Sequence, residues 1–231
     1  RLVGWGINNE GQVAGTVYFQ NGVIDGFIWD PSFGLQVLPD HLPDRILYEA
    51  KGINDYGQVF GNAWNPSYYA EWYHKPYIWE EGVGITDLGT LGNISDQAWG
   101  INNLGQIVGK SRTKNTNRAF LWENGVMTDL GNIGIYNKYL LSVAFGTNNL
   151  GQVVGTSYFI KSDGSFSEES HACLWDTGAT EAIDLTPAGG DSVRSAAFDI
   201  NDAGWIVGTR REWVDGNLST EVLYLWEGGP G

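Results

Sequence analysis

Short apolar runs, separated by turns rich in Gly and Asn, follow one another along the chain and repeat with a long period. The stretch Gly-Ile-Asn-Asn-Leu-Gly-Gln-Ile-Val-Gly, residues 100–109, occurs five times with small changes. The other copies span residues 6–15, 52–61, 146–155 and 199–208. A repeat of this length, made of short strand-like pieces, indicates similar units that stack to bury a common core.

Each unit contains four apolar segments that we expect to be strands, named A to D in chain order. Strand A ends in the Gly-Ile-Asn sequence, and strand B is the Gln-Ile-Val-Gly segment. The Asn-Asn-Leu-Gly between them predicts a hairpin, because Asn and Gly accept turn conformations. Strand C ends in Trp in every unit, and this recurrence predicts packing between units. These residues are Trp29, Trp79, Trp122, Trp175 and Trp226.

Four short antiparallel strands in each unit predict an all-β protein, a five-bladed β-propeller with four-stranded blades. We expect residues 1–231 to form one domain of five repeats, at about 1–45, 46–93, 94–139, 140–190 and 191–231. The fifth unit has no segment D, so the last blade is expected to lack its outer strand. A linear β-solenoid is the main alternative, but its repeats are commonly much shorter.

The repeated motifs resemble those of the bacterial HAF-repeat family of predicted extracellular repeat proteins. The similarity lies in Gly100–Gly109, in Ala119–Trp122 and in Thr86–Gly92, and it extends over nearly the whole chain. The His-Ala-Phe tripeptide itself is replaced, with residues 118–120 (Arg-Ala-Phe) and 171–173 (His-Ala-Cys) as the nearest versions. The resemblance implies secretion or surface display, sometimes with a polysaccharide-rich matrix, and it implies no catalytic residues.

Composition excludes several classes of partner. The formal net charge of −14 disfavours nucleic acid, because binding phosphates requires a basic face. No apolar run is long enough for a membrane span. The single cysteine, Cys173, lies at an apolar strand-C position and is expected to be buried and inert. We expect no cofactor and no metal site, since no Asn- or Asp-rich turn has the spacing of a calcium loop.

The expected strand order places the variable parts of the chain on one face. In an antiparallel meander, the A–B and C–D turns lie on one edge, and the B–C and D–A connections lie on the other. The first set is nearly uniform, whereas the second varies in length and content. Aromatic residues concentrate in the second set, and exposed Trp and Tyr offer large rigid contact areas. The predicted ligand-binding residues are Trp64, Tyr68, Tyr69, Trp72, Tyr73 and Trp213. Alternatively, these rings fold back to hold the long loops in place.

An enzyme is the less favoured reading. Glycosidases usually need two carboxylates at a fixed separation. The candidates Glu49, Asp96 and Asp199 occupy different positions in their units, and His41, His74 and His171 are expected to be isolated surface residues. A glycoside hydrolase or lyase therefore remains a minor alternative.

We accordingly expect a non-catalytic binding or structural propeller, extracellular or at the cell surface. It would recognise carbohydrate or another surface macromolecule through the variable-loop face. The alternative is an assembly subunit of an extracellular matrix, sheath or filament. Self-assembly would then use the open edge of the last blade at Leu223–Trp226, because an unpaired strand can pair with another chain.

Overall fold

The computed structural model describes most of the chain, and every element in it is a β-strand. It covers residues 1–38, 47–64, 74–92, 95–134, 138–161, 164–167, 169–179, 181–186, 193–214, 217–218 and 221–227. For residues 212–214 and 217–218 only the backbone is described. No described residue belongs to a helix with the length and apolar character needed to cross a bilayer.

The strands form five antiparallel sheets, one for each repeat. Sheet 1 contains β1 (Leu2–Ile7), β2 (Val13–Tyr18), β3 (Ile24–Asp30) and β4 (Gly34–Val37). Sheet 2 contains β5 (Leu47–Ile53), β6 (Val59–Trp64), β7 (His74–Glu80) and β8 (Gly84–Asp87). Sheet 3 contains β9 (Gln97–Ile101), β10 (Ile107–Arg112), β11 (Asn117–Glu123) and β12 (Val126–Asp129).

Sheet 4 contains β13 (Ser142–Thr147), β14 (Val153–Ser157), β15 (His171–Trp175) and β16 (Ile183–Asp184). Sheet 5 contains β17 (Val193–Ile200), β18 (Ile206–Val214), β19 (Asn217–Leu218) and β20 (Val222–Trp226). The first four sheets are simple meanders, as the strand A to D pattern predicts. In sheet 5, β18 pairs with both β17 and β20. The C-terminal end of β18, at Trp213 and Val214, also pairs with the short β19. No described strand lies outside β20.

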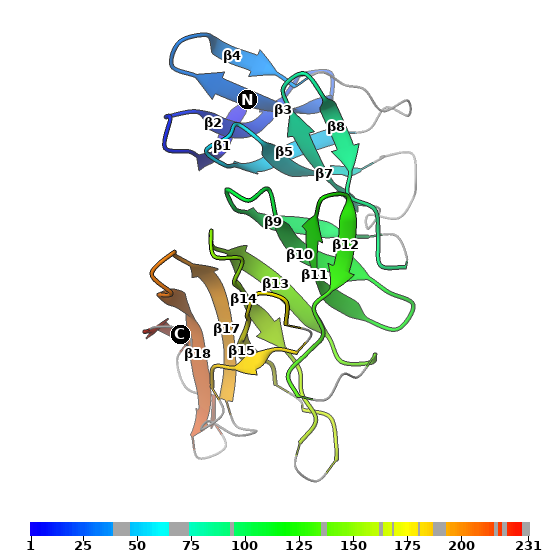
Figure 1. Ribbon diagram of the computed structural model, residues 1–231, viewed down its shortest axis with the longest axis vertical. Coiled ribbons are helices and arrows are strands. Elements are labelled where there is room, and N and C mark those ends of the chain that lie inside the picture. The colour runs from blue at the N-terminus through cyan, green and yellow to red at the C-terminus, as the bar shows by residue number, and fades with distance from the viewer. Residues whose placement is uncertain are drawn as a thin grey trace.

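The five sheets follow one another as blades along an open arc (Figure 1). The first strands of the sheets, β1, β5, β9, β13 and β17, line its concave side, and β4, β8 and β12 lie on the convex side. Strands of consecutive sheets pack on one another, whereas sheet 1 and sheet 5 stand apart at the two ends. The expected blades are therefore present, but among the described residues they do not close into a ring.

The apolar core lies between consecutive sheets, and equivalent positions show this directly. Ile53 is only 8% exposed because it packs against sheet 1, whereas its counterpart Ile7, which faces no described sheet, is 70% exposed. At the other end Leu174 is fully buried, while its counterpart Leu225 in sheet 5 is 55% exposed. Both end faces of the arc thus expose apolar side chains whose counterparts in other sheets are buried.

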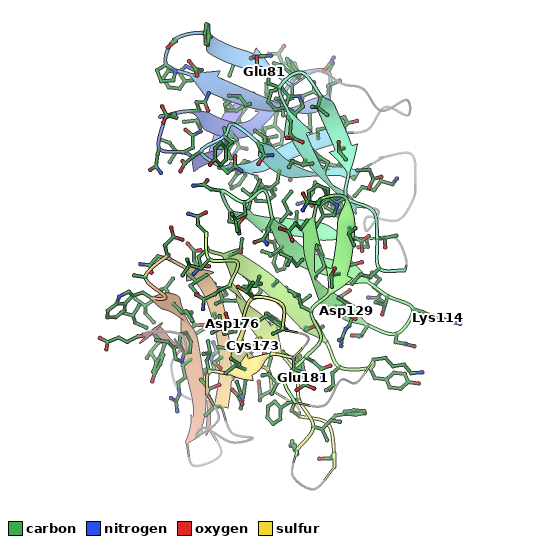
Figure 2. The ribbon with its side chains drawn as sticks, viewed as in Figure 1. Glu81, Lys114, Asp129, Cys173, Asp176 and Glu181 are labelled. Carbon is green, nitrogen blue, oxygen red and sulfur yellow. The ribbon has the colours of Figure 1, made fainter. Side chains whose placement is uncertain are left out.

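The strand-C tryptophans of sheets 2 to 5 pack against the preceding sheet, which confirms the structural role predicted for these four. Trp79, Trp122 and Trp175 are buried, whereas Trp29 lies on the free face of sheet 1 and is 42% exposed. The same packing encloses Cys173, which is fully buried in sheet 4 (Figure 2). Burial raises the pKa of its thiol well above the ordinary value, so the unreactive thiol form is favoured, as predicted.

A ladder of asparagine side chains joins the A–B turns of consecutive sheets. The Nδ2 of Asn8 donates to the carbonyl of Asn54 at 3.0 Å, and Asn54 donates to Asn102 at 3.0 Å. Asn102 continues to Asn148 at 2.8 Å, and Asn148 to Asn201 at 3.1 Å. Each Oδ1 meanwhile accepts backbone N–H groups of its own turn. The Asn of the repeated motif therefore shapes the hairpin and also sets its distance from the next one.

The last glycine of the motif is required by a β-bulge in the adjacent inner strand. Every inner strand has one extra residue opposite strand B, which shifts the register between the flanking pairs. The bulge brings the carbonyl oxygen of Gln97 against Gly109, where an added Cβ would overlap it. The same overlap would occur at Gly15, Gly61, Gly155 and Gly208. Only glycine lets the two backbones approach so closely.

We predict that Asn102→Ala destabilises the fold by about 2–4 kcal/mol, because buried donor and acceptor groups lose their partners. Its side chain is 4% exposed and bonds Gln106, Thr147 and Asn148. Asn201→Ala is the matched control, since that exposed side chain accepts only within its own turn among the described residues. Its cost should be about 1 kcal/mol. Urea unfolding measures both, and equal losses would contradict the ladder.

We predict that Gly109→Ala costs about 3 kcal/mol or more, because the new methyl group cannot be accommodated without moving the inner strand. Gly125→Ala is the comparison, since Gly125 has open space around it and a φ of 82°. That variant should lose only the backbone strain of about 1–2 kcal/mol. Thermal unfolding of both proteins provides the measurement. A Gly109 variant no less stable than the Gly125 variant would show that the close approach is unimportant.

Candidate ligand-binding site

The bulges place one side chain from each inner strand in a row along the concave side. We call this row the inner strip; it consists of Trp5, Lys51, Trp99, Phe145 and Phe198. β-Bulges re-aim side chains and are frequent beside functional sites. Members of the strip contact one another within sheets 3 to 5, and Lys51 contacts Trp5 across sheets 1 and 2. The rings of Trp99 and Phe145 stack at 4.7 Å, and those of Phe145 and Phe198 meet edge to face at 5.5 Å.

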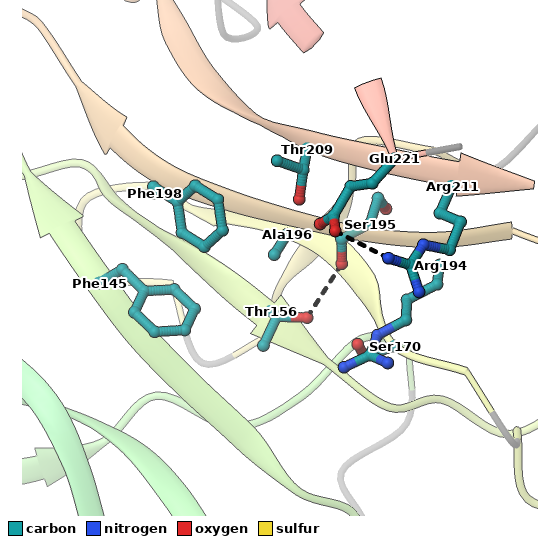
Figure 3. A pocket seen from close by; sticks show the side chains of 10 residues that line it. All are labelled: Phe145, Thr156, Ser170, Arg194, Ser195, Ala196, Phe198, Thr209, Arg211 and Glu221. Carbon is teal, nitrogen blue, oxygen red and sulfur yellow. Dashed lines mark hydrogen bonds and ion pairs between the residues drawn. The ribbon is translucent and has the colours of Figure 1, made fainter. Parts of the chain in front are cut away.

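A groove opens between sheets 4 and 5 at one end of the inner strip (Figure 3). Its volume is about 380 Å³, which lies in the range of small-molecule sites. Phe145 and Phe198 lie at one end of the groove, and Arg194 and Arg211 lie at the other. The remaining lining residues are Thr156, Ser170, Ser195, Ala196, Thr209 and Glu221. Several adjoin the B–C and D–A connections, so the groove belongs to the variable-loop face.

The groove contains aromatic rings at one end and charged hydrogen-bonding groups at the other. Phe198 is 45% exposed, whereas Thr156 is nearly buried and donates to backbone carbonyls of sheets 4 and 5. The Nη2 of Arg211 donates to Glu221 at 2.9 Å. A hydrogen bond from Thr209 lowers the pKa of Glu221, and the charge of Arg211 adds to this effect. Glu221 is therefore ionised at neutral pH and holds the guanidinium in place.

Arg194 and Arg211 differ in how accessible their donors are. Arg194 is 62% exposed in its side chain, and its Nε lies 4.0 Å from the carboxylate of Glu169. The Nε of Arg211 is buried without a hydrogen-bond partner in the described structure, so it is not accessible from the groove. An arginine presents five donors, and these contacts use only part of them. The groove can thus donate to hydroxyl or carboxylate oxygens while an aromatic ring covers an apolar face of the same ligand.

Two further hollows lie on the turn face, and many of their polar groups bond to one another. One, of about 300 Å³, is rimmed by the asparagine ladder and its neighbours. The other, of about 310 Å³, lies between sheets 1 and 2 and includes Gln12, Asp30 and Asp55. Gln12 donates to Asp30 at 2.9 Å, and Asn9 binds both oxygens of Asp55. These contacts build the turns, so we place the candidate site in the groove between sheets 4 and 5.

The carboxylates considered for catalysis have structural partners. Asp96 is 3% exposed and accepts the backbone N–H of Arg112 at 2.7 Å, and burial raises its pKa. Glu49 accepts from Tyr18 at 3.1 Å and pairs with Lys51 at 2.7 Å. Asp199 is exposed and accepts the N–H of Ile200. The three lie on different sheets, and none lines the groove.

The expectation that the histidines lie isolated at the surface is wrong for His171. Its side chain is buried, and Nδ1 lies 2.9 Å from Asp184 of the next strand. The pair is structural, and its counterpart in sheet 3 is the ion pair between buried Arg118 and Asp129. His74 is half-buried, and this burial lowers the pKa of its imidazole. His41 lies outside the described residues.

The predicted ligand-binding residues are only partly described. Trp64 ends β6, is half-buried, and has its ring 5.9 Å from the His74 ring, away from the groove. Trp213 lies in β18, where its backbone pairs with Leu218. Tyr68, Tyr69, Trp72 and Tyr73 lie outside the described residues. Their role in binding therefore stays a prediction.

Sequence reasoning missed the residues that line the groove. Arg194, Arg211 and Glu221 lie far from Phe145 in the chain and meet only because sheets 4 and 5 pack together. The signal for the inner strip is present in the sequence, since its members all precede the first motif residue of their unit. Four of the five are aromatic. In the sequence alone, this position is not distinguishable from the rest of strand A.

Comparison with known proteins establishes the fold class. The model of a family of proteins of unknown function (DUF3466) matches residues 134–226, which is less than half of the chain and includes sheets 4 and 5. It provides no link to the HAF-repeat family. None of the curated proteins compared with the chain matches it significantly.

Among solved structures, the β-propeller domain of the Trilobed protease from Pyrococcus furiosus, described as having an open velcro topology, superimposes with a TM-score of 0.59. It is 14% identical, and the match covers 98% of this chain and 67% of that one. A six-bladed fucose-binding lectin from Aleuria aurantia gives a TM-score of 0.43 at 10% identity, with 96% and 77% covered. The first likeness identifies the arc as β-propeller in fold, and the remainder of that longer chain has no counterpart here.

Proposed function

We propose that this chain is a non-catalytic binding module that holds carbohydrate in the groove between sheets 4 and 5. The observation that carries the proposal is the pairing of the exposed Phe198 ring with the Arg211–Glu221 pair in one hollow. A sugar ring has an apolar face, which suits an aromatic platform, and a rim of hydroxyl groups. Guanidinium and carboxylate groups supply the donors and the acceptors that such a rim requires.

A binding role is favoured over catalysis by the charges in the groove. Among the described residues that line it, Glu221 is the one carboxylate, and its pKa is lowered. General acid catalysis of glycoside cleavage needs a carboxyl group with a raised pKa and usually a second carboxylate. Secretion or surface display is part of the proposal and rests on the resemblance of the repeated motifs to the HAF-repeat family.

We predict that Phe198→Ala and Arg211→Ala each weaken carbohydrate binding about tenfold, since each removes contacts worth roughly 1–1.5 kcal/mol. A glycan array selects the ligand, and isothermal titration calorimetry measures its Kd. Tyr56→Ala is the matched control, because this 76% exposed ring lies on the turn face. Absence of any glycan ligand would refute the proposal. Binding that survives both groove substitutions would place the site elsewhere.

A second candidate function, as an assembly subunit, is favoured by the apolar ends of the arc. Leu223 and Leu225 of β20 are 79% and 55% exposed, and Ile7 at the opposite end is 70% exposed. Exposed apolar surfaces of this kind mark interaction sites. Association of the two unlike ends would be head to tail and would produce rings or filaments.

We predict that, if this second function applies, sedimentation velocity will show larger species as the protein concentration rises. Leu223→Asp should abolish them, because it places a charge in the contact. Leu104→Asp, at a 56% exposed position on the turn face, is the control and should leave association unchanged. A monomer at every concentration would exclude the assembly function and leave the carbohydrate proposal intact.

A further inference from the structure

The inner strip extends the groove across the whole concave side of the arc. Phe145 and Phe198 belong to both features, and the strip then continues through Trp99 toward Lys51 and Trp5 at the other end. Its end members remain accessible, since Trp5 is 49% exposed and Phe198 is 45% exposed. Ring contacts therefore run from Phe198 to Trp99 over sheets 5 to 3, and Lys51 contacts Trp5 in sheets 2 and 1. The inner strands that carry these residues follow one another along the concave side of the arc (Figure 1).

Cationic side chains alternate with the rings of the strip. The Nζ of Lys51 lies 4.4 Å from the centre of the Trp5 ring, and the Nζ of Lys110 lies 5.3 Å from that of Trp99. Arg194 and Arg211 line the same groove as Phe198, at its opposite end. The chain has only 13 Lys and Arg against 27 Asp and Glu. Lys51 and Arg211 pair with Glu49 and Glu221, so Lys110 and the exposed Arg194 are the cations of this region best placed to meet an anion.

The lysine beside Trp99 is the clearest sign that this surface is built for a partner. Lys110 is half-buried and forms no ion pair with a described residue. Partial burial, together with the charge of Arg112, lowers its pKa. A cation held against an aromatic face without a carboxylate loses hydration, and an arriving anion would compensate for that loss.

We infer that the groove is one subsite of an extended site, and that the ligand is a linear acidic polysaccharide lying along the inner strip. This inference rests on the proposed carbohydrate-binding function. Successive sugar rings would lie against the parts of Phe198, Phe145 and Trp99 that the neighbouring rings leave uncovered, while their carboxylates would face Arg194 and Lys110. Regular units along the polymer match the regular spacing of the bulges, which comes from the repeated motif.

The test is the dependence of affinity on chain length, measured by calorimetry with oligogalacturonates of one to eight residues. Affinity is expected to rise by at least about tenfold from the monomer to the longest oligomer, because additional subsites act together. It should fall as salt is added, since ionic contacts are screened. Uncharged cello-oligosaccharides of the same lengths should bind more weakly. Equal affinity for all lengths, or equal affinity for the neutral series, overturns the inference.

Substitutions in the strip separate this inference from the proposed function. Lys110→Gln and Trp99→Leu should weaken the longest oligomer about tenfold and leave the monomer unchanged. Phe198→Ala should weaken both, and Lys110→Arg should retain binding of the long oligomer. Tyr56→Ala is again the control, and thermal unfolding verifies that each variant is folded. If short sugars bind but longer oligomers bind no more tightly, this inference is overturned while the proposed function stands. If no carbohydrate of any kind binds, both this inference and the proposed function are refuted.

Discussion

The close approach of each inner strand to the last glycine of the motif is the constraint on which the rest of the structure depends. At Gly109 the carbonyl of Gln97 occupies the space of a side chain, and that approach exists because Trp99 is an extra residue in β9. The glycine and the bulge therefore require each other. Because the pair occurs in all five sheets, the side chains at the bulges line up, and a scaffold motif determines the geometry of a candidate binding surface.

The asparagine ladder sets the position of each sheet relative to the next one. Each Asn fixes its own turn through Oδ1 and positions the next sheet through Nδ2, so the distance between blades is set by hydrogen bonds as well as by apolar packing. Such nearest-neighbour coupling makes the stability of a repeat protein approximately a sum over units and interfaces. Among the described residues, the first and last sheets have one such interface each, whereas the internal sheets have two. The exposed Ile7 and Leu225 are the direct result, since their internal counterparts are covered by a neighbour.

The repeats made the fold predictable, because a pattern seen five times removes most of the ambiguity of a single strand. The meander order, the hairpin at Asn102–Gly105 and the buried Trp79, Trp122 and Trp175 follow directly from it. The bulges did not follow, since one extra residue inside an apolar strand leaves the composition unchanged. The open arc did not follow either. Whether the first and last blades meet depends on small rotations at each interface, which no motif records.

The candidate site was harder to predict, because it depends on contacts between units rather than within them. Aromatic density in the loops led to the face on which the groove lies, and whether that face binds a ligand stays a prediction. The groove obtains its charge from Arg194, Arg211 and Glu221, which no local pattern connects. The inner strip presents the opposite case. Its residues share one position in the repeat, yet they differ in identity, from Lys51 to Phe198. A position that the backbone holds fixed while the side chain varies can change what is bound without altering the fold. The inner strip therefore combines the regular spacing of the repeat with side chains that differ from blade to blade.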